Sequence, residues 1–205
     1  MSGCEIIYYM LTKPAISIKD FQESKPVGWA FFVVLLAIIS SHVGGVLISS
    51  VNLNVAHIIL SYGLLVRVIF IIGIWIVGTA IIHLFAEWFD GDGTVSSLFI
   101  ALGFSFLPAI LICPFALLIQ NYPHIIKLSL YLCFNLIILL WIVKLEIVSI
   151  KEVYHISSFR AIMVVSTPVT LGIIGIISLI IIALLMAFSL SSSSLPRPPF
   201  SIFPQ

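Results

Sequence analysis

The sequence predicts an all-α integral membrane protein, a five-transmembrane-helix bundle, from three observations. The first is composition: 61% of the 205 residues are hydrophobic and 8% are charged, whereas about a quarter of the residues in a soluble domain are charged. The second is that only five charged residues lie between Lys25 and Lys144, since a charged side chain in hydrocarbon costs about 2.5–3.5 kcal/mol. The third is that five apolar runs reach the ~20 residues with which a helix crosses ~30 Å of hydrocarbon.

The predicted elements follow in order along the chain. Residues 1–26 carry several charges and lack the apolar run and cleavage site of a secretory signal peptide, so we expect a cytosolic N-terminal segment. The membrane domain, residues 27–190, is expected to contain spans at about 27–49, 67–88, 95–119, 125–148 and 161–190. Each span is apolar on every face, which is typical of helices and not of barrel strands. The Ser- and Pro-rich residues 191–205 are expected to form a disordered tail.

The connections between the spans carry most of the polar residues. Between spans two and three, Gly91 and Gly93 allow positive φ, so we expect them to reverse the chain within a few residues. Asp92 or Thr94 is expected to cap the helix that follows. Residues 50–63 are weakly polar and are expected to continue into the second helix. Residues 144–158 are amphipathic, so they either continue span four or lie at the membrane surface as a docking face.

The distribution of charge predicts the orientation of the chain. With five spans, six of the nine basic residues fall on the side that holds the N-terminus and three fall on the other. The positive-inside rule therefore predicts a multi-pass protein of the cell membrane with a cytoplasmic N-terminus and an outside C-terminus. All eight acidic residues also lie on the cytoplasmic side, so partner docking is expected there. Arg67, on the other side, is expected to extend its side chain to the membrane interface.

Several residues inside the spans bend a helix or place a polar group in it. Pro108, Pro114 and Pro168 each remove a helix hydrogen bond and are expected to introduce a kink. Such kinks either line a pathway or improve packing, with neighbouring groups such as Ser105 satisfying the freed carbonyls. His42 is either a proton-relay residue or a hydrogen-bonded packing residue.

Composition and motifs argue against several classes of function. A net charge of +1 with scattered basic residues argues against nucleic-acid binding. The sequence has no nucleophile elbow, P-loop, His-Glu-x-x-His or dinucleotide motif, so an enzyme is not expected. The three cysteines lack C-x-x-C spacing and are expected to be inert thiols. No cofactor and no metal are predicted.

One polar group offers an alternative to this view. His83 and Glu87 lie four residues apart and so share a helix face, with Asp90 and Asp92 immediately beyond. Carboxylates and imidazole are ligands for divalent cations, which would suit an enzyme acting on lipid. An ordinary solvated loop contains the same residues, and this is the interpretation that we prefer.

Short motifs occur in a fixed order along residues 11–188. They are Leu11-Thr12-Lys13-Pro14 with Phe21, Lys25-Pro26 and Trp29; Gly91-Asp92-Gly93-Thr94-Val95-Ser96; Gly103-Phe104-Ser105 with Pro108; and Trp141, Val153-Tyr154-His155-Ile156-Ser157, Arg160-Ala161 and Pro168. Together they resemble the Yip (Ypt/Rab-interacting protein) domain family, and within it the short prokaryotic members. The resemblance implies a five-span membrane fold. Eukaryotic relatives work in vesicle trafficking with small GTPases, whereas the short prokaryotic relatives have no settled role.

The candidate interaction or structural residues come from these motifs. They are Asp90, Gly91, Asp92, Gly93, Ser105, Pro108, Tyr154, Ser157, Arg160 and Pro168. The first hypothesis is a non-enzymatic scaffold that organises membrane or recruits a partner through its cytosolic loops. The alternative is a small transporter or channel component with proline-kinked helices. Expected partners are the lipid bilayer and a protein at the cytosolic face, with a second copy of the chain as a further option.

Overall fold

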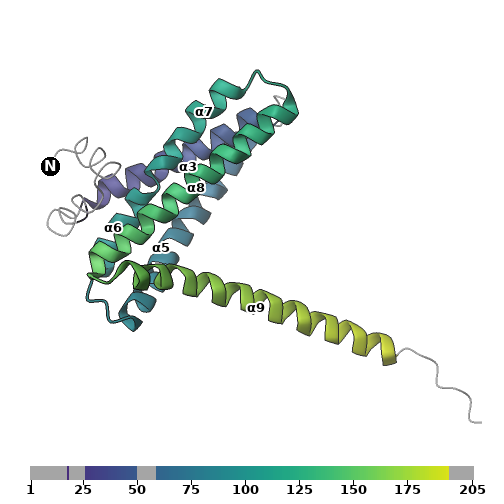
Figure 1. Ribbon diagram of the computed structural model, residues 1–205. Helices are drawn as coiled ribbons and strands as arrows, with labels where there is room; N and C mark the ends of the chain where they lie inside the picture. The colour runs from purple at the N-terminus through teal and green to yellow at the C-terminus, as the bar shows by residue number, and fades with distance from the viewer. Residues whose placement is uncertain (1–17, 19–25, 50–58, 194–205) are drawn as a thin grey trace, which may run out of the picture. The chain divides into compact units, whose positions relative to one another are not determined.

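Helices form every regular element that the structure describes. The computed structural model describes residue 18 and residues 26–49 and 59–193, with side chains up to residue 186. The elements are α3 (Val27–Ile48), η1 (Ile59–Gly63), α5 (Leu64–Trp88), α6 (Val95–Ser105), η2 (Leu107–Leu111), α7 (Ile112–Ile119), α8 (His124–Tyr154) and α9 (Ser158–Ser193) (Figure 1). The predicted all-α class is confirmed. Nearly all of the predicted N-terminal segment, the motif residues before Pro26, and the tail beyond residue 193 lie outside the described residues.

Five helices in the described ranges are long and apolar enough to cross a membrane, as predicted. They are Val27–Ile48, Ser61–Trp88, Val95–Ile119, His124–Tyr154 and Ser158–Met186. The second begins earlier than the predicted span because the π-helical turn η1 leads directly into α5. The fourth continues through Lys151 and Glu152 to Tyr154 without a break. The amphipathic segment therefore continues span four, which was the first of the two alternatives.

The third span is interrupted at Pro108. α6 ends at Ser105, the 3₁₀ segment η2 contains Pro108, and α7 begins at Ile112. Ser40 of α3 satisfies backbone groups at this interruption: its Oγ donates to the Ile110 carbonyl at 2.7 Å and accepts from the Cys113 N–H at 3.0 Å. The interruption is therefore packed against α3.

Pro114 does not interrupt the helix in the same way. It is the third residue of α7, where a backbone N–H would have no partner within the helix. Nearby, α3 approaches α7 closely at Gly44, because a Cβ there would lie 3.0 Å from Cγ2 of Ile112. A small residue in α3 therefore allows the two backbones to pack together in this part of the bundle.

The chain divides into two compact units, residues up to Val165 and residues from Ser166 onward. In the first, the core lies among α3, α5, α6 and α8 and contains three packed aromatic rings. The Trp75 ring stacks on Phe99 at a centroid distance of 3.9 Å, and Phe31 meets Trp75 edge-on at 5.0 Å. A Cβ on Gly103 would lie 2.7 Å from Cζ2 of Trp75, so this glycine provides space for the indole.

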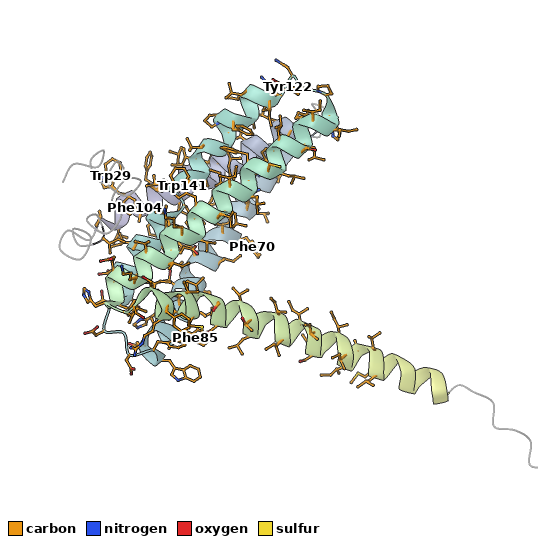
Figure 2. All side chains as sticks on the ribbon, in the orientation of Figure 1. Trp29, Phe70, Phe85, Phe104, Tyr122 and Trp141 are labelled. Carbon is orange, nitrogen blue, oxygen red and sulfur yellow. The ribbon has the colours of Figure 1, made fainter. Side chains whose placement is uncertain are left out.

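Apolar side chains also cover the outside of the first unit. Figure 2 shows side chains projecting from the helices in all directions, and it labels Phe104 of the core and Phe70 of the outside. Phe104 is 0% exposed, whereas Phe70 on α5 is 65% exposed. Exposed apolar side chains at this density suit a helix surrounded by lipid.

The second unit contains the remainder of α9. Residues 169–186 are all exposed and almost all apolar, which is again the pattern of a membrane-spanning helix. Pro168 lies inside α9, and the helix continues through it to Ser193. Pro168 therefore lies within a continuous helix and does not end it.

Replacing Ser40 with alanine is expected to lower the free energy of unfolding by about 1–2 kcal/mol, because buried backbone groups beside Pro108 lose their partner. The midpoint of denaturation by sodium dodecyl sulfate in mixed micelles measures this change. Ser49→Ala is the matched control, since the exposed Ser49 Oγ donates to the Val46 carbonyl of the adjoining helix α3 and, among the described residues, bonds no other helix. Equal stability of the two variants would contradict the role given to Ser40.

Candidate functional site

The candidate site lies where the end of α5, the loop after it, the end of α8 and the start of α9 meet. We call it the Tyr154 cluster. It comprises His83, Glu87, Asp90, Gly91, Gly93, Tyr154, Ser157 and Arg160. Tyr154 is the last residue of α8 and is 0% exposed. All of these residues belong to the first unit.

A chain of side-chain contacts ties α8 to α5. Tyr154 Oη lies 2.5 Å from Nδ1 of His83, and Nε2 of His83 lies 3.2 Å from Oε1 of Glu87. A carboxylate only accepts hydrogen bonds, so in the neutral ring Nε2 carries the hydrogen and Nδ1 accepts the phenol hydrogen. The His83 ring is thereby held between a buried tyrosine and a half-exposed carboxylate.

The loop after α5 packs tightly on Tyr154 through its two glycines. A Cβ on Gly91 would lie 2.8 Å from Cδ1 of Tyr154, and a Cβ on Gly93 would lie 2.6 Å from the Val153 carbonyl oxygen. Neither glycine has a positive φ, so the expectation that they reverse the chain through positive φ is wrong. Glycine is required here because the loop backbone lies directly against the ring and the end of α8.

The residue with positive φ in this turn is Asp90. The Asp90 N–H donates to the Glu87 carbonyl at 3.1 Å and the Gly91 N–H to the Ala86 carbonyl at 3.0 Å, which is the bond pattern of a Schellman motif. Asp90 has φ 62° at the position where this motif usually has glycine, because a Cβ there costs about 1 kcal/mol. A carboxylate that is 88% exposed is therefore placed where glycine would fit with less strain.

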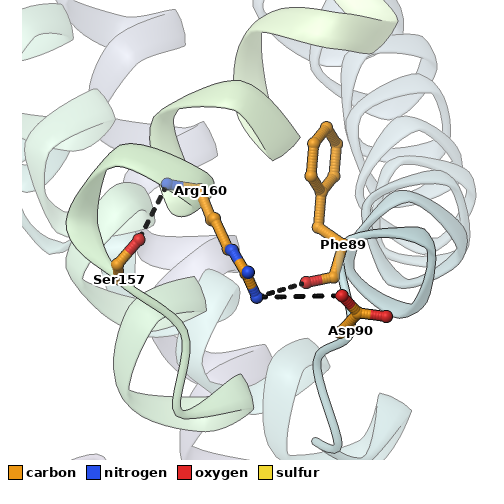
Figure 3. A network of polar contacts seen from close by, with 4 residues as sticks. All are labelled: Phe89, Asp90, Ser157 and Arg160. Atoms are coloured by element: carbon orange, nitrogen blue, oxygen red, sulfur yellow. Dashed lines mark hydrogen bonds and ion pairs between the residues drawn. The ribbon is translucent and has the colours of Figure 1, made fainter.

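Arg160 joins the start of α9 to the same turn (Figure 3). Its Nη1 donates to the Phe89 carbonyl at 3.3 Å and lies 3.9 Å from Oδ2 of Asp90. Its backbone N–H donates to Ser157 Oγ at 3.4 Å, so Ser157 caps the first turn of α9. The guanidinium is 51% exposed, and an ion pair of this exposure contributes at most about 1 kcal/mol. A positive charge at the last carbonyls of α5 also complements the helix dipole.

The remaining predicted site residues lie elsewhere or take no part in these contacts. Asp92 is exposed in the loop, and it is Thr94, the other predicted cap, whose Oγ1 accepts from the Ser97 N–H at 3.4 Å. Ser105 is 0% exposed and donates to the Ala101 carbonyl within α6. Pro108 is buried in η2.

Among the described residues no group of three or more His, Cys, Asp and Glu side chains could hold a metal ion, which argues against the alternative cation site at His83, Glu87, Asp90 and Asp92. The sequence analysis did not single out Trp88 and Phe159, which are 78% and 68% exposed and adjoin Phe89 and Arg160 in the chain. Aromatic residues at the ends of apolar runs are the signal that could have found them.

Replacing Gly93 with alanine is expected to lower the free energy of unfolding by about 1–3 kcal/mol, because the new Cβ meets the Val153 carbonyl and the Tyr154 ring. Gly78→Ala in α5 is the matched control, since a Cβ at Gly78 meets nothing within 4 Å, and helix propensity then favours alanine by about 1 kcal/mol. Unfolding in mixed micelles measures both. A Gly93 variant as stable as the Gly78 variant would contradict the close packing.

The described architecture agrees with a comparison against family models. Residues 8–180 match the model of the Yip1 domain. No curated protein and no solved structure matches the chain. The family match covers most of the 205 residues, including all five apolar helices in whole or in part. This chain is a multi-pass membrane protein that belongs to the Yip1 domain family.

Proposed function

We propose that this Yip1 domain protein is a non-enzymatic membrane scaffold that recruits a protein partner at the cytosolic face through the Tyr154 cluster. The observation that carries the proposal is that a buried side chain packs against the turns that present the exposed charged side chains. Tyr154 is 0% exposed, whereas Asp90 and Arg160 are 88% and 51% exposed. Charges held at fixed positions can select a partner by complementary charge and orient its approach.

The packing of the two chain reversals supports a recruiting role. The loop after α5 is held by the Schellman motif and by the contact of its glycines with Tyr154. The turn after α8 contains His155 with φ 54° and Ile156, which is 6% exposed. A surface that is ordered before binding avoids much of the entropy cost of ordering a loop in the complex.

The residue types at this surface also suit an interface. Trp and Arg are enriched among the side chains that contribute most to protein–protein binding, and the turn presents Trp88 and Arg160 in exposed positions. Trp is equally favoured at the boundary between membrane and water. Both preferences support a location of the Tyr154 cluster at the membrane surface, within reach of a water-soluble partner.

The basic residues of the described ranges support placing the Tyr154 cluster on the cytosolic side. Lys151 and Arg160 lie at this end of the bundle, near the end of α8 and at the start of α9, and Lys144 lies in the half of α8 nearer to this end. Arg67 and Lys127 lie near the other ends of α5 and α8. An excess of basic residues at one end favours that end as cytosolic.

We do not extend the proposal to transport. Many membrane transporters bind their substrate near the middle of the membrane, at a site formed by interrupted helices. The interruption at Pro108 is instead packed against Ser40, whose hydroxyl bonds both Ile110 and Cys113. This packing gives the interruption a structural explanation.

Partner recruitment is tested by cross-linking in the producing cells, purification in mild detergent and quantitative mass spectrometry of co-isolated proteins. Arg160→Gln within the cluster and Asp92→Asn, at the exposed position between the two glycines of the cluster, are each expected to lower recovery of the partner about tenfold, which corresponds to ~1.4 kcal/mol of binding free energy. Lys151→Gln is the matched control, because Lys151 pairs with Glu152 at 3.5 Å outside the cluster. Equal recovery with all three variants, or no protein specific to the wild type, would refute the proposal.

Asp90→Gly separates stability from recruitment. Glycine relieves the positive-φ strain, so the free energy of unfolding is expected to stay equal or rise by up to ~1 kcal/mol. Loss of the exposed carboxylate is expected to lower partner recovery in the same cross-linking assay. A variant that is more stable and recovers the partner fully would show that the Asp90 carboxylate has no part in docking.

A further inference from the structure

Arg67 and Glu87 lie about one hydrocarbon thickness apart along α5. They lie twenty residues apart in one helix, and a rise of 1.5 Å per residue makes this separation about 30 Å, the thickness of the hydrocarbon core. With Glu87 at the surface that carries the Tyr154 cluster, Arg67 reaches the opposite boundary. The head-group region of the bilayer, which contains the lipid phosphates, begins at this boundary.

Within the described ranges, the guanidinium of Arg67 has one hydrogen-bond acceptor, Ser41, and no ion-pair partner. Its Nη2 donates to Ser41 Oγ at 3.3 Å, and a guanidinium has five N–H donors. In the described part of the chain the ion pairs join His83 to Glu87, Lys151 to Glu152 and Arg160 to Asp90, so Arg67 pairs with none of these carboxylates. The Ser41 hydroxyl itself donates to the Ile38 carbonyl at 3.0 Å. Ser41 is therefore fixed and orients the guanidinium.

Apolar space adjoins this cation on two sides. A cavity of about 160 Å³ lies among α3, α5, η2 and α8, and apart from Arg67 and Ser41 its lining is apolar, including Val34, Ile38, Ile71 and Ile142. A second, more open groove of about 390 Å³ shares Arg67 and Ile71 with it. Along α3 the cavity runs from Ser41 to Val34, about 10 Å toward the middle of the membrane. We call the two together the Arg67 groove.

We propose that the Arg67 groove binds one anionic phospholipid. The phosphate accepts hydrogen bonds from the guanidinium, and an acyl chain lies in the apolar cavity along Ile38 and Val34. Charge complementarity favours an anionic lipid over a zwitterionic one, because the positive charge of Arg67 matches a net negative head group. The planar guanidinium also presents paired donors that fit two phosphate oxygens.

Native mass spectrometry of the purified full chain tests this site. The protein is exchanged from micelles that contain equal amounts of phosphatidylglycerol and phosphatidylcholine with the same acyl chains. One phosphatidylglycerol is expected to stay bound, with at least a tenfold preference over phosphatidylcholine. Arg67→Gln is expected to abolish the preference, and Arg67→Lys to retain part of it because it keeps the charge and loses the planar donor pair.

Lys127→Gln is the matched control. Lys127 lies near the start of α8, at the same end of the bundle as Arg67 and outside the groove lining, so its loss is expected to leave lipid retention unchanged. Equal retention of the two lipids by the wild type, or equal preference in the Arg67→Gln and Lys127→Gln variants, would overturn the proposal.

A competition on the wild type tests the apolar part of the groove without any substitution. Glycerol phosphate carries the anion and lacks the acyl chain, so a large excess is expected to leave phosphatidylglycerol bound. Displacement by glycerol phosphate at a concentration comparable to the lipid would show a simple anion site and overturn the lipid assignment.

Discussion

Hydrocarbon offers no hydrogen-bond partner to a polypeptide, so each break in a membrane helix needs a partner from the protein itself. This constraint explains the most irregular part of the bundle. Pro108 lies where the regular helix ends inside the third span, and the Ser40 hydroxyl of α3 donates to the Ile110 carbonyl and accepts from the Cys113 N–H. The same requirement brings α3 and α7 close together, with Gly44 allowing contact at Ile112. The packing of the bundle thus depends on a serine and a glycine of the first span.

At the polar end of the bundle, Tyr154 has the comparable role. Its ring fills the space left by Gly91 and Gly93, and its hydroxyl bonds His83 on α5. Two chain reversals that are distant in sequence are thereby held against one buried side chain. Arg160 adds a further link, from α9 to the last carbonyls of α5. These contacts leave Asp90, Asp92 and Arg160 exposed beside packed side chains, which is the physical basis for the proposed recruiting surface.

The features that could be predicted from the sequence are those that depend on the residue types within a short segment. The five apolar helices, the interruption at Pro108 and the Thr94 cap follow from hydrophobicity, a missing N–H and a side-chain acceptor. The reason for Gly91 and Gly93 was not predictable, because the ring that excludes a Cβ lies about sixty positions further along the chain. The positive φ falls on Asp90 instead. The hydrogen bond between His83 and Tyr154 joins residues 71 positions apart, so no local sequence pattern predicts it.

The location of the Tyr154 cluster at the cytosolic face is the central claim, and single-cysteine labelling tests it most directly. The native cysteines are replaced by serine, and Asp92→Cys and His155→Cys are made separately at exposed positions in the two turns. A membrane-impermeant maleimide is applied to sealed vesicles of either orientation. Both cysteines are predicted to react only when the cytosolic face is outward. Reaction from the opposite side, or reaction of the two variants from different sides, would contradict this account.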